Sequence, residues 1–338
     1  MSHNIEYVPV ERTPDAFQKS VSLPHIQSMC ARAFGEKIQI ESIREFDGGG
    51  FNNVYLITLD ETRHVVLRVA PATDTHIPVS DQTLMHNEQY LQPYFAPIAH
   101  LMPKTLMIDF TRQILDRDYL FQTFIEGENW AKIQGQLTEG EKIKLWGQLG
   151  HIAKQIHSVQ GKSFGSPCAD PQFSQWSDAV IYGLEQRIKD IEMYSLDATS
   201  IRTIVELARN HTKLLDEITH PSLLHGDLWT VNILIKRDEN GPRIVAVLDS
   251  DRGSWGEPMA DWTMFLLGWH KPKGAEAFWE RYGQVADGLG PEFRKLIYQA
   301  GAIGGAFVEA QQHGRKDTIV RGYNDLKNIV TQLHALVG

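Results

Sequence analysis

Three polar side chains that could carry out chemistry lie at short spacing near residue 230. His225 and Asp227 flank a glycine, and Asn232 follows directly before the apolar run 233–235. A buried strand at the downstream end would hold this loop, so that its polar side chains are aimed rather than mobile. A carboxylate placed in this way can accept a hydroxyl proton, and an amide oxygen can bind a hard cation such as Mg²⁺.

A second carboxylate is predicted to reach the same place through a hairpin. The apolar run 244–248 ends at Asp249, and the turn 237–242 contains an Asn-Gly step, which is a strong hairpin signal. Such a hairpin returns Asp249 beside Asn232, as in phosphoryl-transfer enzymes that hold Mg²⁺ and orient a hydroxyl. Each residue alone would more often be a turn former or a buried histidine, but the combined spacing favours the catalytic interpretation.

The motifs around these residues resemble those of the aminoglycoside phosphotransferase and choline kinase family. The resemblance is carried by His-Gly-Asp at 225–227, Asn232, Asp249, Asp251, Gly-Glu-Pro at 256–258 and Asp261. It implies an α+β, two-lobed, protein-kinase-like fold. An antiparallel-sheet N-lobe would cover residues 1–126, and a mainly helical C-lobe would cover residues 127–338.

The resemblance also implies roles for the polar residues of the C-lobe. Asp227 would orient and deprotonate the acceptor hydroxyl, and His225 would brace the loop. Asn232 and Asp249 would hold Mg²⁺ on the β- and γ-phosphates of ATP or GTP. We expect Asp261 to anchor the loop by accepting backbone hydrogen bonds.

Two further acidic residues are candidates for contacting the substrate. Asp251 follows the expected metal ligand closely, and a role toward the metal or the substrate stays open for it. Glu257 stands where members of the family often have aspartate. The segment that joins Asp249 to Asp261 is too short for the long activation loop of a protein kinase, which argues against a protein substrate.

A glycine run upstream is the first candidate for binding nucleotide phosphates. Gly48, Gly49 and Gly50 separate two predicted strands. One interpretation is a flexible hairpin tip. The other is a loop whose backbone N–H groups contact phosphates, because only glycine allows so close an approach. The order strand, glycine loop, strand resembles the family's N-lobe and favours the second interpretation.

The remaining nucleotide-binding candidates rest on the resemblance. Arg68 stands on the third predicted strand, where protein kinases carry lysine, and it would clamp phosphates with Glu88 as its partner. A surface arginine and an exposed helical glutamate are the alternatives. Thr123 and Ile125 lie in a stretch that resembles the hinge, where backbone groups would bind adenine.

Hydrophobic periodicity places these residues on strands and helices. The predicted strands are 38–46, 51–59, 64–70, 105–108, 113–115 and 119–124. The predicted helices are 22–35, 81–92, 138–157, two between 172 and 219, 275–282, 292–312 and 317–337. Trp176, Tyr182 and Tyr194 could line a pocket, but core packing is the default for aromatic residues at such spacing.

Composition excludes some classes of function. The 338-residue chain is 42% hydrophobic with a net charge of −9, and it has no Lys/Arg-rich run, which argues against a nucleic-acid partner. No apolar run is long enough to span a membrane, and the N-terminus does not resemble a signal peptide. Two widely spaced cysteines, Cys30 and Cys168, suit a reducing cytoplasm as free thiols. The mild acidity serves solubility, or alternatively attracts a cationic acceptor.

Together these patterns predict an enzyme that moves the γ-phosphoryl group of ATP or GTP to a hydroxyl of a small molecule. The favoured acceptor is an aminoglycoside-like antibiotic, which would make the protein a resistance enzyme. The alternative is a metabolic kinase for choline, homoserine, methylthioribose or a fructosamine, and the Asp-Leu-Trp step at 227–229 resembles fructosamine kinases. A non-catalytic nucleotide-binding protein is a third possibility. The sequence leaves the acceptor and the oligomeric state open.

Overall fold

The computed structural model describes residues 5–12, 16–47, 50–72, 75, 77–78, 81–168, 171–263, 265, 267 and 272–338. The chain divides into two compact units. Unit 1 comprises Met1–Ile77 and Met102–Glu126, and unit 2 comprises Pro78–Leu101 and Gly127–Gly338. The sequence-based division also changes lobe after residue 126, but it differs in one segment. Residues 78–101 group with unit 2, because the 3₁₀ segment η2 (Gln92–Leu101) packs on α4 (Glu139–His157) and β10 (Gly241–Val247) of that unit.

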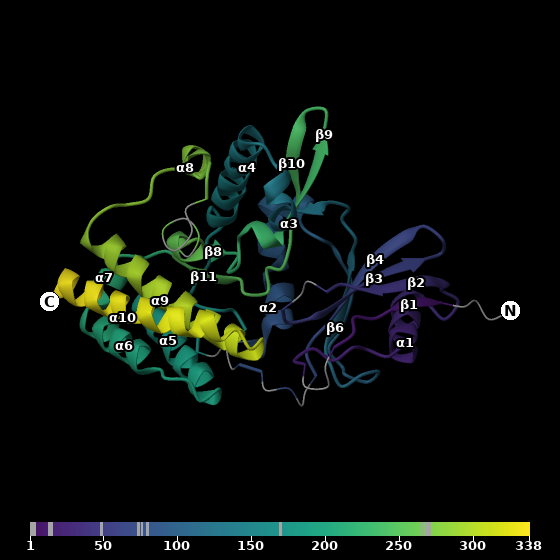
Figure 1. Ribbon diagram of the computed structural model, residues 1–338, viewed down its shortest axis with the longest axis horizontal. Helices are drawn as coiled ribbons and strands as arrows, with labels where there is room; N and C mark the ends of the chain where they lie inside the picture. The colour runs from purple at the N-terminus through teal and green to yellow at the C-terminus, as the bar shows by residue number, and fades with distance from the viewer. Residues whose placement is uncertain are drawn as a thin grey trace. The chain divides into compact units, whose positions relative to one another are not determined.

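Unit 1 is built on a six-stranded sheet with the order β1-β2-β3-β4-β6-β5 (Figure 1). Its strands are β1 (Glu6–Val8), β2 (Ile40–Glu45), β3 (Asn53–Leu59), β4 (Arg63–Val69), β5 (Thr105–Asp109) and β6 (Tyr119–Thr123). All neighbouring strands are antiparallel except β1, which pairs with β2 in parallel. In β3 every second residue is buried, as expected for a strand with one face on a core.

One helix covers that buried face of the sheet. Helix α1 (Leu23–Phe34) starts after Ser22 with a proline in its first turn and ends at Gly35, whose φ is +100°. Its side chains Ile26 and Met29 are fully buried in one cluster with residues of β2, β3 and β4. The predicted helix at 22–35 is therefore confirmed.

The predicted strand at 113–115 is wrong. This stretch lies in the loop between β5 and β6, within a series of bends. Arg112 closes the loop by donating from Nε and Nη2 to the two carboxylate oxygens of Asp118, at 2.9 and 3.0 Å. Ile114 and Leu115 then pack on the core as loop residues. Their apolar character reflects this packing and not a strand.

Unit 2 is mainly helical, as predicted. Its α-helices are α2 (Leu84–Leu91), α3 (Trp130–Ile133), α4 (Glu139–His157), α5 (Trp176–Met193), α6 (Thr199–Asn210), α7 (Thr212–Leu215), α8 (Glu276–Tyr282), α9 (Leu289–Gln312) and α10 (Lys316–Val337). Its 3₁₀ segments are η2 (Gln92–Leu101), η3 (Gln134–Gln136), η4 (Thr230–Asn232) and η5 (Pro258–Asp261). Its strands are β7 (Glu128–Asn129), β8 (Ser222–Leu224), β9 (Ile233–Asp238), β10 (Gly241–Val247) and β11 (Ser254–Gly256).

Two groups of helices position the polar loops of unit 2. Helices α5, α6, α9 and α10 pack around one hydrophobic core and lie together in Figure 1. Trp176 is buried in this core and Tyr194 packs against it, which is the default expectation for both. Helix α4 begins at the predicted capping box, in which Glu141 N–H donates to the Thr138 hydroxyl oxygen.

Helix α4 also holds the β9–β10 hairpin. The pairing of the two strands shifts register between Ile244 and Ala246, which marks a bulge. The Gln148 side chain of α4 accepts from Ile244 N–H at 2.8 Å and donates to the Pro242 carbonyl at 3.2 Å. One amide therefore satisfies two backbone groups of β10 that lie beside this irregularity.

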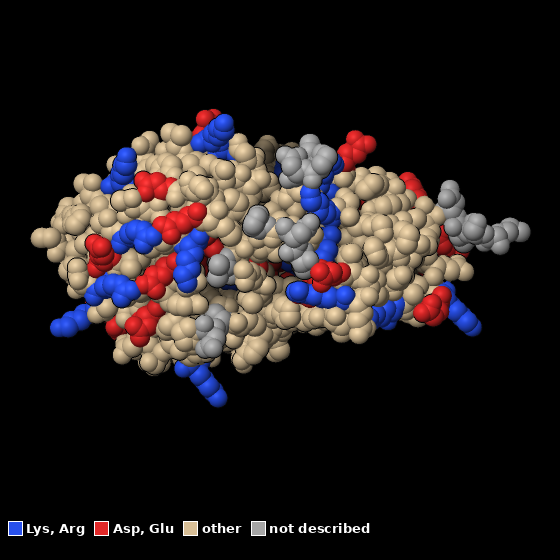
Figure 2. All heavy atoms as spheres, turned by 90° about the horizontal axis from the view of Figure 1, so that it is seen from below, with Lys and Arg blue, Asp and Glu red and all other residues tan. Residues whose placement is uncertain are grey.

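Both cysteines are free, as the sequence predicts. Burial raises the pKa of the Cys30 thiol to about 12. Among the described residues, no helix has the length and apolar character that a bilayer crossing requires. On the face drawn in Figure 2, acidic and basic side chains are interspersed among neutral residues.

Candidate active site

The polar loop at 225–232 lies between β8 and β9, and the predicted hairpin brings the second carboxylate to it. Strand β9 pairs with β10 in antiparallel register, with Ile233 opposite Val247. Immediately beyond, the Leu248 N–H donates to the Asn232 carbonyl at 2.8 Å. The hairpin therefore places Asp249 next to the loop that carries Asp227, as predicted.

Asp227 is held by the amide of Asn232. The Asn232 Nδ2 donates to the Asp227 Oδ2 at 2.7 Å and to the Asp227 backbone carbonyl at 2.9 Å. Burial and the charge of Asp249 raise the pKa of Asp227 to about 6, although Arg252 and Asn232 oppose the shift. A carboxylate with a raised pKa accepts a proton more readily than an ordinary aspartate, which suits a general base.

His225 and Asp261 fix the loop from behind. The Asp261 carboxylate accepts the backbone N–H groups of His225 at 2.8 Å and Gly226 at 2.6 Å, which is the anchoring expected from the sequence. It also accepts from the His157 Nε2 at 2.9 Å. The His225 ring is fully buried, burial lowers its pKa, and its Nδ1 accepts the Asp227 N–H at 3.3 Å. His225 is therefore placed to brace the loop as a neutral ring.

Three carboxylates form a group that fits a divalent cation. Glu88, Asp249 and Asp251 each offer one oxygen, and these oxygens lie within 4.8 Å of one another. Such hard oxygen donors suit Mg²⁺. Asp249 belongs to the expected metal pair, whereas its predicted partner Asn232 directs its amide nitrogen to Asp227.

Glu88 has a place that the sequence argument missed. Its carboxylate belongs to the acidic group of unit 2, and its expected pairing with Arg68 stays a prediction. Only 6% of Glu88 is exposed, so the alternative of an exposed helical glutamate is excluded. A signal was present in the sequence, because Glu88 shares the apolar stripe of α2 with Leu84 and Leu91, and a buried carboxylate needs a partner.

Two residues without an assigned role hold the segment after Asp249. The buried Asn87 donates its Nδ2 to the carbonyls of Asp251 at 2.8 Å and Gly253 at 2.6 Å. Gly226 has a φ of +82°, and a Cβ there would lie 2.0 Å from the Arg252 carbonyl oxygen. Only glycine allows this approach, which explains why Gly226 stands where protein kinases have arginine.

Glu257, one of the two substrate candidates, lies in a buried network. Its Oε2 accepts from the Arg294 Nε at 2.9 Å and from the Tyr298 hydroxyl at 2.5 Å. Burial raises the pKa of Glu257 and leaves 7% of the residue exposed. This carboxylate therefore faces protein partners, and the other substrate candidate, Asp251, lies in the acidic group.

In unit 1, two of the three glycines expected at the phosphates, Gly48 and Gly49, lie outside the described residues. Gly50 is exposed next to them. The end of the loop is fixed by Asn53, whose Nδ2 donates to the Glu45 Oε1 at 2.6 Å. Arg117 in turn donates to the Asn53 Oδ1. The strand that follows the glycines therefore starts from a rigid, buried polar cluster.

Arg68 and the hinge residues also lie in unit 1. Arg68 is 7% exposed on β4, which pairs with β3 and β6, so the alternative of an arginine on an exposed strand edge is wrong. Thr123 exchanges backbone and side-chain hydrogen bonds with Lys104, and its N–H donates to the Lys104 carbonyl. Ile125, just beyond the end of β6, is thus the better placed of the two hinge candidates to offer backbone groups.

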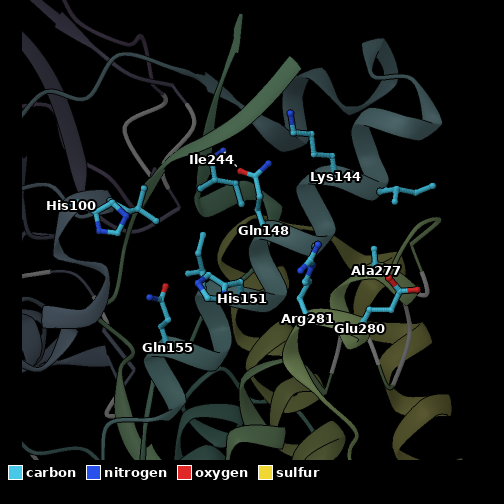
Figure 3. Close-up of a pocket in the computed structure, with 13 residues that line it drawn as sticks. His100, Lys144, Gln148, His151, Gln155, Ile244, Ala277, Glu280 and Arg281 are labelled. Atoms are coloured by element: carbon cyan, nitrogen blue, oxygen red, sulfur yellow. Dashed lines mark hydrogen bonds between the residues drawn. The ribbon is translucent and has the colours of Figure 1, made fainter. Parts of the chain in front are cut away.

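A hollow elsewhere in unit 2 contains none of these residues. It has a volume of about 680 Å³ and lies along α4, next to α8, β10 and the end of η2 (Figure 3). Its polar lining includes His100, His151, Gln155 and Arg281. The loop of Asp227 and the acidic group are not part of its wall.

The fold and the loop geometry define a kinase-like phosphotransferase, and comparison with solved structures supports this fold. Aminoglycoside phosphotransferase APH(4)-Ia, as a thermostable mutant, is similar with a TM-score of 0.64 at 18% identity, over 90% of this chain and 98% of that chain. A protein from Ralstonia eutropha assigned as an aminoglycoside phosphotransferase has a TM-score of 0.63 at 13% identity, over 93% and 98%. A protein from Haemophilus somnus assigned as a fructosamine-3-kinase has a TM-score of 0.64 at 17% identity, over 90% and 96%.

The sequence itself identifies the family. The family model described as the phosphotransferase enzyme family matches residues 42–296, and the chain belongs to this family. None of the curated proteins matches the sequence. The family membership confirms the resemblance that the motifs carried, and it makes the chain a small-molecule phosphotransferase.

Proposed function

We propose that the protein transfers the γ-phosphoryl group of ATP to a hydroxyl of a small molecule. The observation that carries this proposal is the Asp227 carboxylate, which has a raised pKa, is held by Asn232 and lies beside Asp249. In the step, Asp227 takes the acceptor's hydroxyl proton as the new O–P bond forms. The bond from the γ-phosphorus to the bridging oxygen breaks, and ADP leaves with that electron pair.

The chain's own residues would position both substrates. Glu88, Asp249 and Asp251 would hold Mg²⁺, which neutralises charge on the β- and γ-phosphates when it is bound. We assign Arg68 and the glycines 48–50 to the phosphates and Ile125 to adenine, with unit 1 as the nucleotide-binding lobe. His225 and Asp261 keep the loop in one conformation, so that little reorganisation is needed during transfer.

The acceptor has two candidate classes. APH(4)-Ia forms a ternary complex with AMP-PNP and hygromycin B, which supports the aminoglycoside-like acceptor that we favour from the motifs. The fructosamine-3-kinase neighbour and the Asp-Leu-Trp step support a metabolic sugar derivative. Trp229, which lies within the loop 225–232, stacks on Phe265 with ring centroids 4.4 Å apart. This flat aromatic pair suits the face of a sugar ring, which both classes contain.

The decisive experiment measures ADP release with Mg–ATP and a panel of hydroxylated acceptors. The panel contains hygromycin B and other aminoglycosides, a fructosamine, choline, homoserine and methylthioribose. We expect turnover with one class and its loss, by a factor of about 10² to 10⁴, in Asp227→Asn. Full turnover in that variant would contradict the role of Asp227, and activity with several unrelated acceptors would contradict a dedicated site.

A further inference from the structure

We propose that Arg187 and Arg252 form a subsite beside Asp227 that binds an anionic group of the acceptor, either a carboxylate or a phosphate. The inference rests on the proposed function, because it concerns the molecule whose hydroxyl Asp227 would receive. On charge, it narrows the acceptor to a hydroxylated acid or zwitterion, and so it argues against the polycationic aminoglycoside class that the motifs favour.

Arg252 starts from backbone that touches the catalytic loop. A Cβ on Gly226, the residue before Asp227, would lie 2.9 Å from the Cβ of Arg252. Burial and Asp249 raise the pKa of Asp227, and the positive charge of Arg252 counteracts them. The stem of Arg252 therefore lies against the catalytic loop, and its positive charge acts on the carboxylate to which the acceptor would come.

The conformation of Arg252 is fixed before any ligand binds. Its Nη1 donates to the Asp81 Oδ1 at 2.7 Å. The carbonyls on either side of Arg252, those of Asp251 and Gly253, both accept from Asn87. A side chain that is already ordered loses little entropy on binding, so it can contribute most of its interaction energy to a ligand.

Arg187 of α5 packs against α9. A Cβ on Gly304 would lie 2.7 Å from the Arg187 Cγ, so the absence of a side chain at Gly304 leaves room for the arginine stem. The Arg187 Nη1 donates to the Asp190 Oδ2 at 3.3 Å. Burial lowers the pKa of Arg187, and the charges of both Asp81 and Arg252 act on it. Arg187 is therefore within electrostatic range of the ion pair that Arg252 forms with Asp81.

Exposure decides which charges an acceptor meets. The side chain of Arg252 is 39% exposed and that of Arg187 is 20% exposed. The side chain of Asp81 is only 8% exposed and that of Asp190 is 0% exposed. The carboxylates therefore lie behind the guanidinium groups, which present positive charge and forked donors toward carboxylate or phosphate oxygens.

A structural role is the competing interpretation, in which the cluster only ties the start of α2 to α5. Binding of simple anions separates the two. Malonate and glycerol 3-phosphate are titrated calorimetrically into the full chain, with saturating Mg–ADP so that the nucleotide site is filled. We expect both to bind to the wild type, and we expect Arg187→Gln and Arg252→Gln to weaken binding by about tenfold to hundredfold.

A matched control lies on the neighbouring helix α6. Arg209 of α6 pairs with Glu185 of α5 on the surface, so Arg209→Gln removes an arginine that faces α5 outside the cluster. We expect this variant to bind the anions like the wild type. Absence of anion binding to the wild type, or equal binding to all three variants, would overturn the subsite. Retained Mg–ADP binding shows that each variant is folded.

The Asp81→Asn variant tests whether the cluster binds a negatively or a positively charged group. Removing the negative charge that pairs with Arg252 should strengthen malonate binding. If Asp81 instead holds a cationic acceptor, the variant would weaken the binding of hygromycin B and leave malonate unaffected, and the proposal would fall.

Turnover with matched acceptors completes the test. Homoserine is compared with 3-aminopropan-1-ol, and gluconate with sorbitol, so that each pair differs in one carboxylate. We expect Arg187→Gln to raise KM for the acids while KM for the uncharged or cationic partners stays unchanged. Turnover confined to the partners without a carboxylate would refute the subsite but leave the phosphotransferase function intact. Failure of Mg–ADP to bind to the wild type would instead contradict the proposed function.

Discussion

Asn232 donates to both the side chain and the backbone carbonyl of Asp227, at 2.7 and 2.9 Å, and so fixes the carboxylate in one orientation. The fixed carboxylate lies near Asp249, and this arrangement has an energetic cost. Burial and the neighbouring charge raise its pKa to about 6 from the usual 3.8 of an aspartate. The raised pKa of Asp227 therefore suits proton acceptance but lowers the stability of the folded protein when the group is ionised.

We predict that Asp227→Asn stabilises the metal-free protein while it abolishes turnover. A carboxyl whose folded pKa lies above its unfolded pKa favours folding when it is protonated, and it loses that contribution as pH rises through about 6. The variant should therefore gain about 1–3 kcal/mol over the wild type at pH 7.5 in EDTA. The gain should vanish near pH 4. Denaturant unfolding at both pH values measures it, and a loss of stability at pH 7.5 would contradict the electrostatic argument.

We predict that Asp261→Asn loosens the catalytic loop. Burial raises the pKa of Asp261, but the hydrogen bonds from His157 and from the backbone N–H of His225 outweigh this, and the net pKa is lowered. Such a group stabilises the fold above its unfolded pKa, and that contribution is lost as pH falls through the folded pKa. The variant should lose about 2–4 kcal/mol at neutral pH and have a smaller pH dependence in acid.

Kinetics provides the second measurement on Asp261→Asn. Because Asp261 holds the backbone of the loop, kcat should fall. KM for ATP should stay within about threefold, because the ground-state contacts to ATP are retained. Unchanged kcat in a folded variant would show that the loop keeps its geometry without this anchor.

We predict that Gly226→Ala damages both folding and catalysis. The substituted residue must keep a φ of +82° and place its Cβ 2.0 Å from the Arg252 carbonyl oxygen. The cost should be about 2–4 kcal/mol of stability with a large loss of kcat. Gly183→Ala is the matched control, because a Cβ there meets nothing within 4 Å inside α5. That variant should gain about 0.5–1 kcal/mol.

We predict that Mg²⁺ stabilises the protein through the acidic group. Ion binding relieves the repulsion among Glu88, Asp249 and Asp251, so Mg²⁺ should raise the melting temperature. In Glu88→Gln, an about tenfold higher Mg²⁺ concentration should be needed for the same rise in melting temperature. Glu139→Gln, on the exposed start of α4, should leave it unchanged. An equal response of both variants would place the ion elsewhere.

The sequence was informative where the chemistry is local. His225, Asp227 and Asn232 lie on one loop, and the hairpin signal at 237–242 was enough to bring Asp249 to them. The anchoring role of Asp261 followed from its place after a short loop. Periodicity also located the long helices α4, α9 and α10 within a few residues.

Residues brought together over long distances were harder to predict. Asn87 and Asp81 reach the segment after Asp249 from more than a hundred residues upstream, and no local pattern marks such a contact. Arg187 could not be foreseen either, because its position depends on room left by a glycine of another helix. The false strand at 113–115 arose because apolar loop residues that pack on a core have the same composition as a short strand.

The two hydrogen bonds of Gln148 limit which substitutions are tolerated at this position, because they support the β9–β10 hairpin that leads to Asp249. Its amide oxygen accepts a hydrogen bond from the Ile244 N–H, and its amide nitrogen donates one to the Pro242 carbonyl. Glutamate has nearly the same shape but no proton to give at neutral pH, so it would repel the Pro242 carbonyl. Leucine would leave both peptide groups without a partner. A change at Gln148 could thus misalign Asp249, the proposed metal ligand, through the backbone of β10.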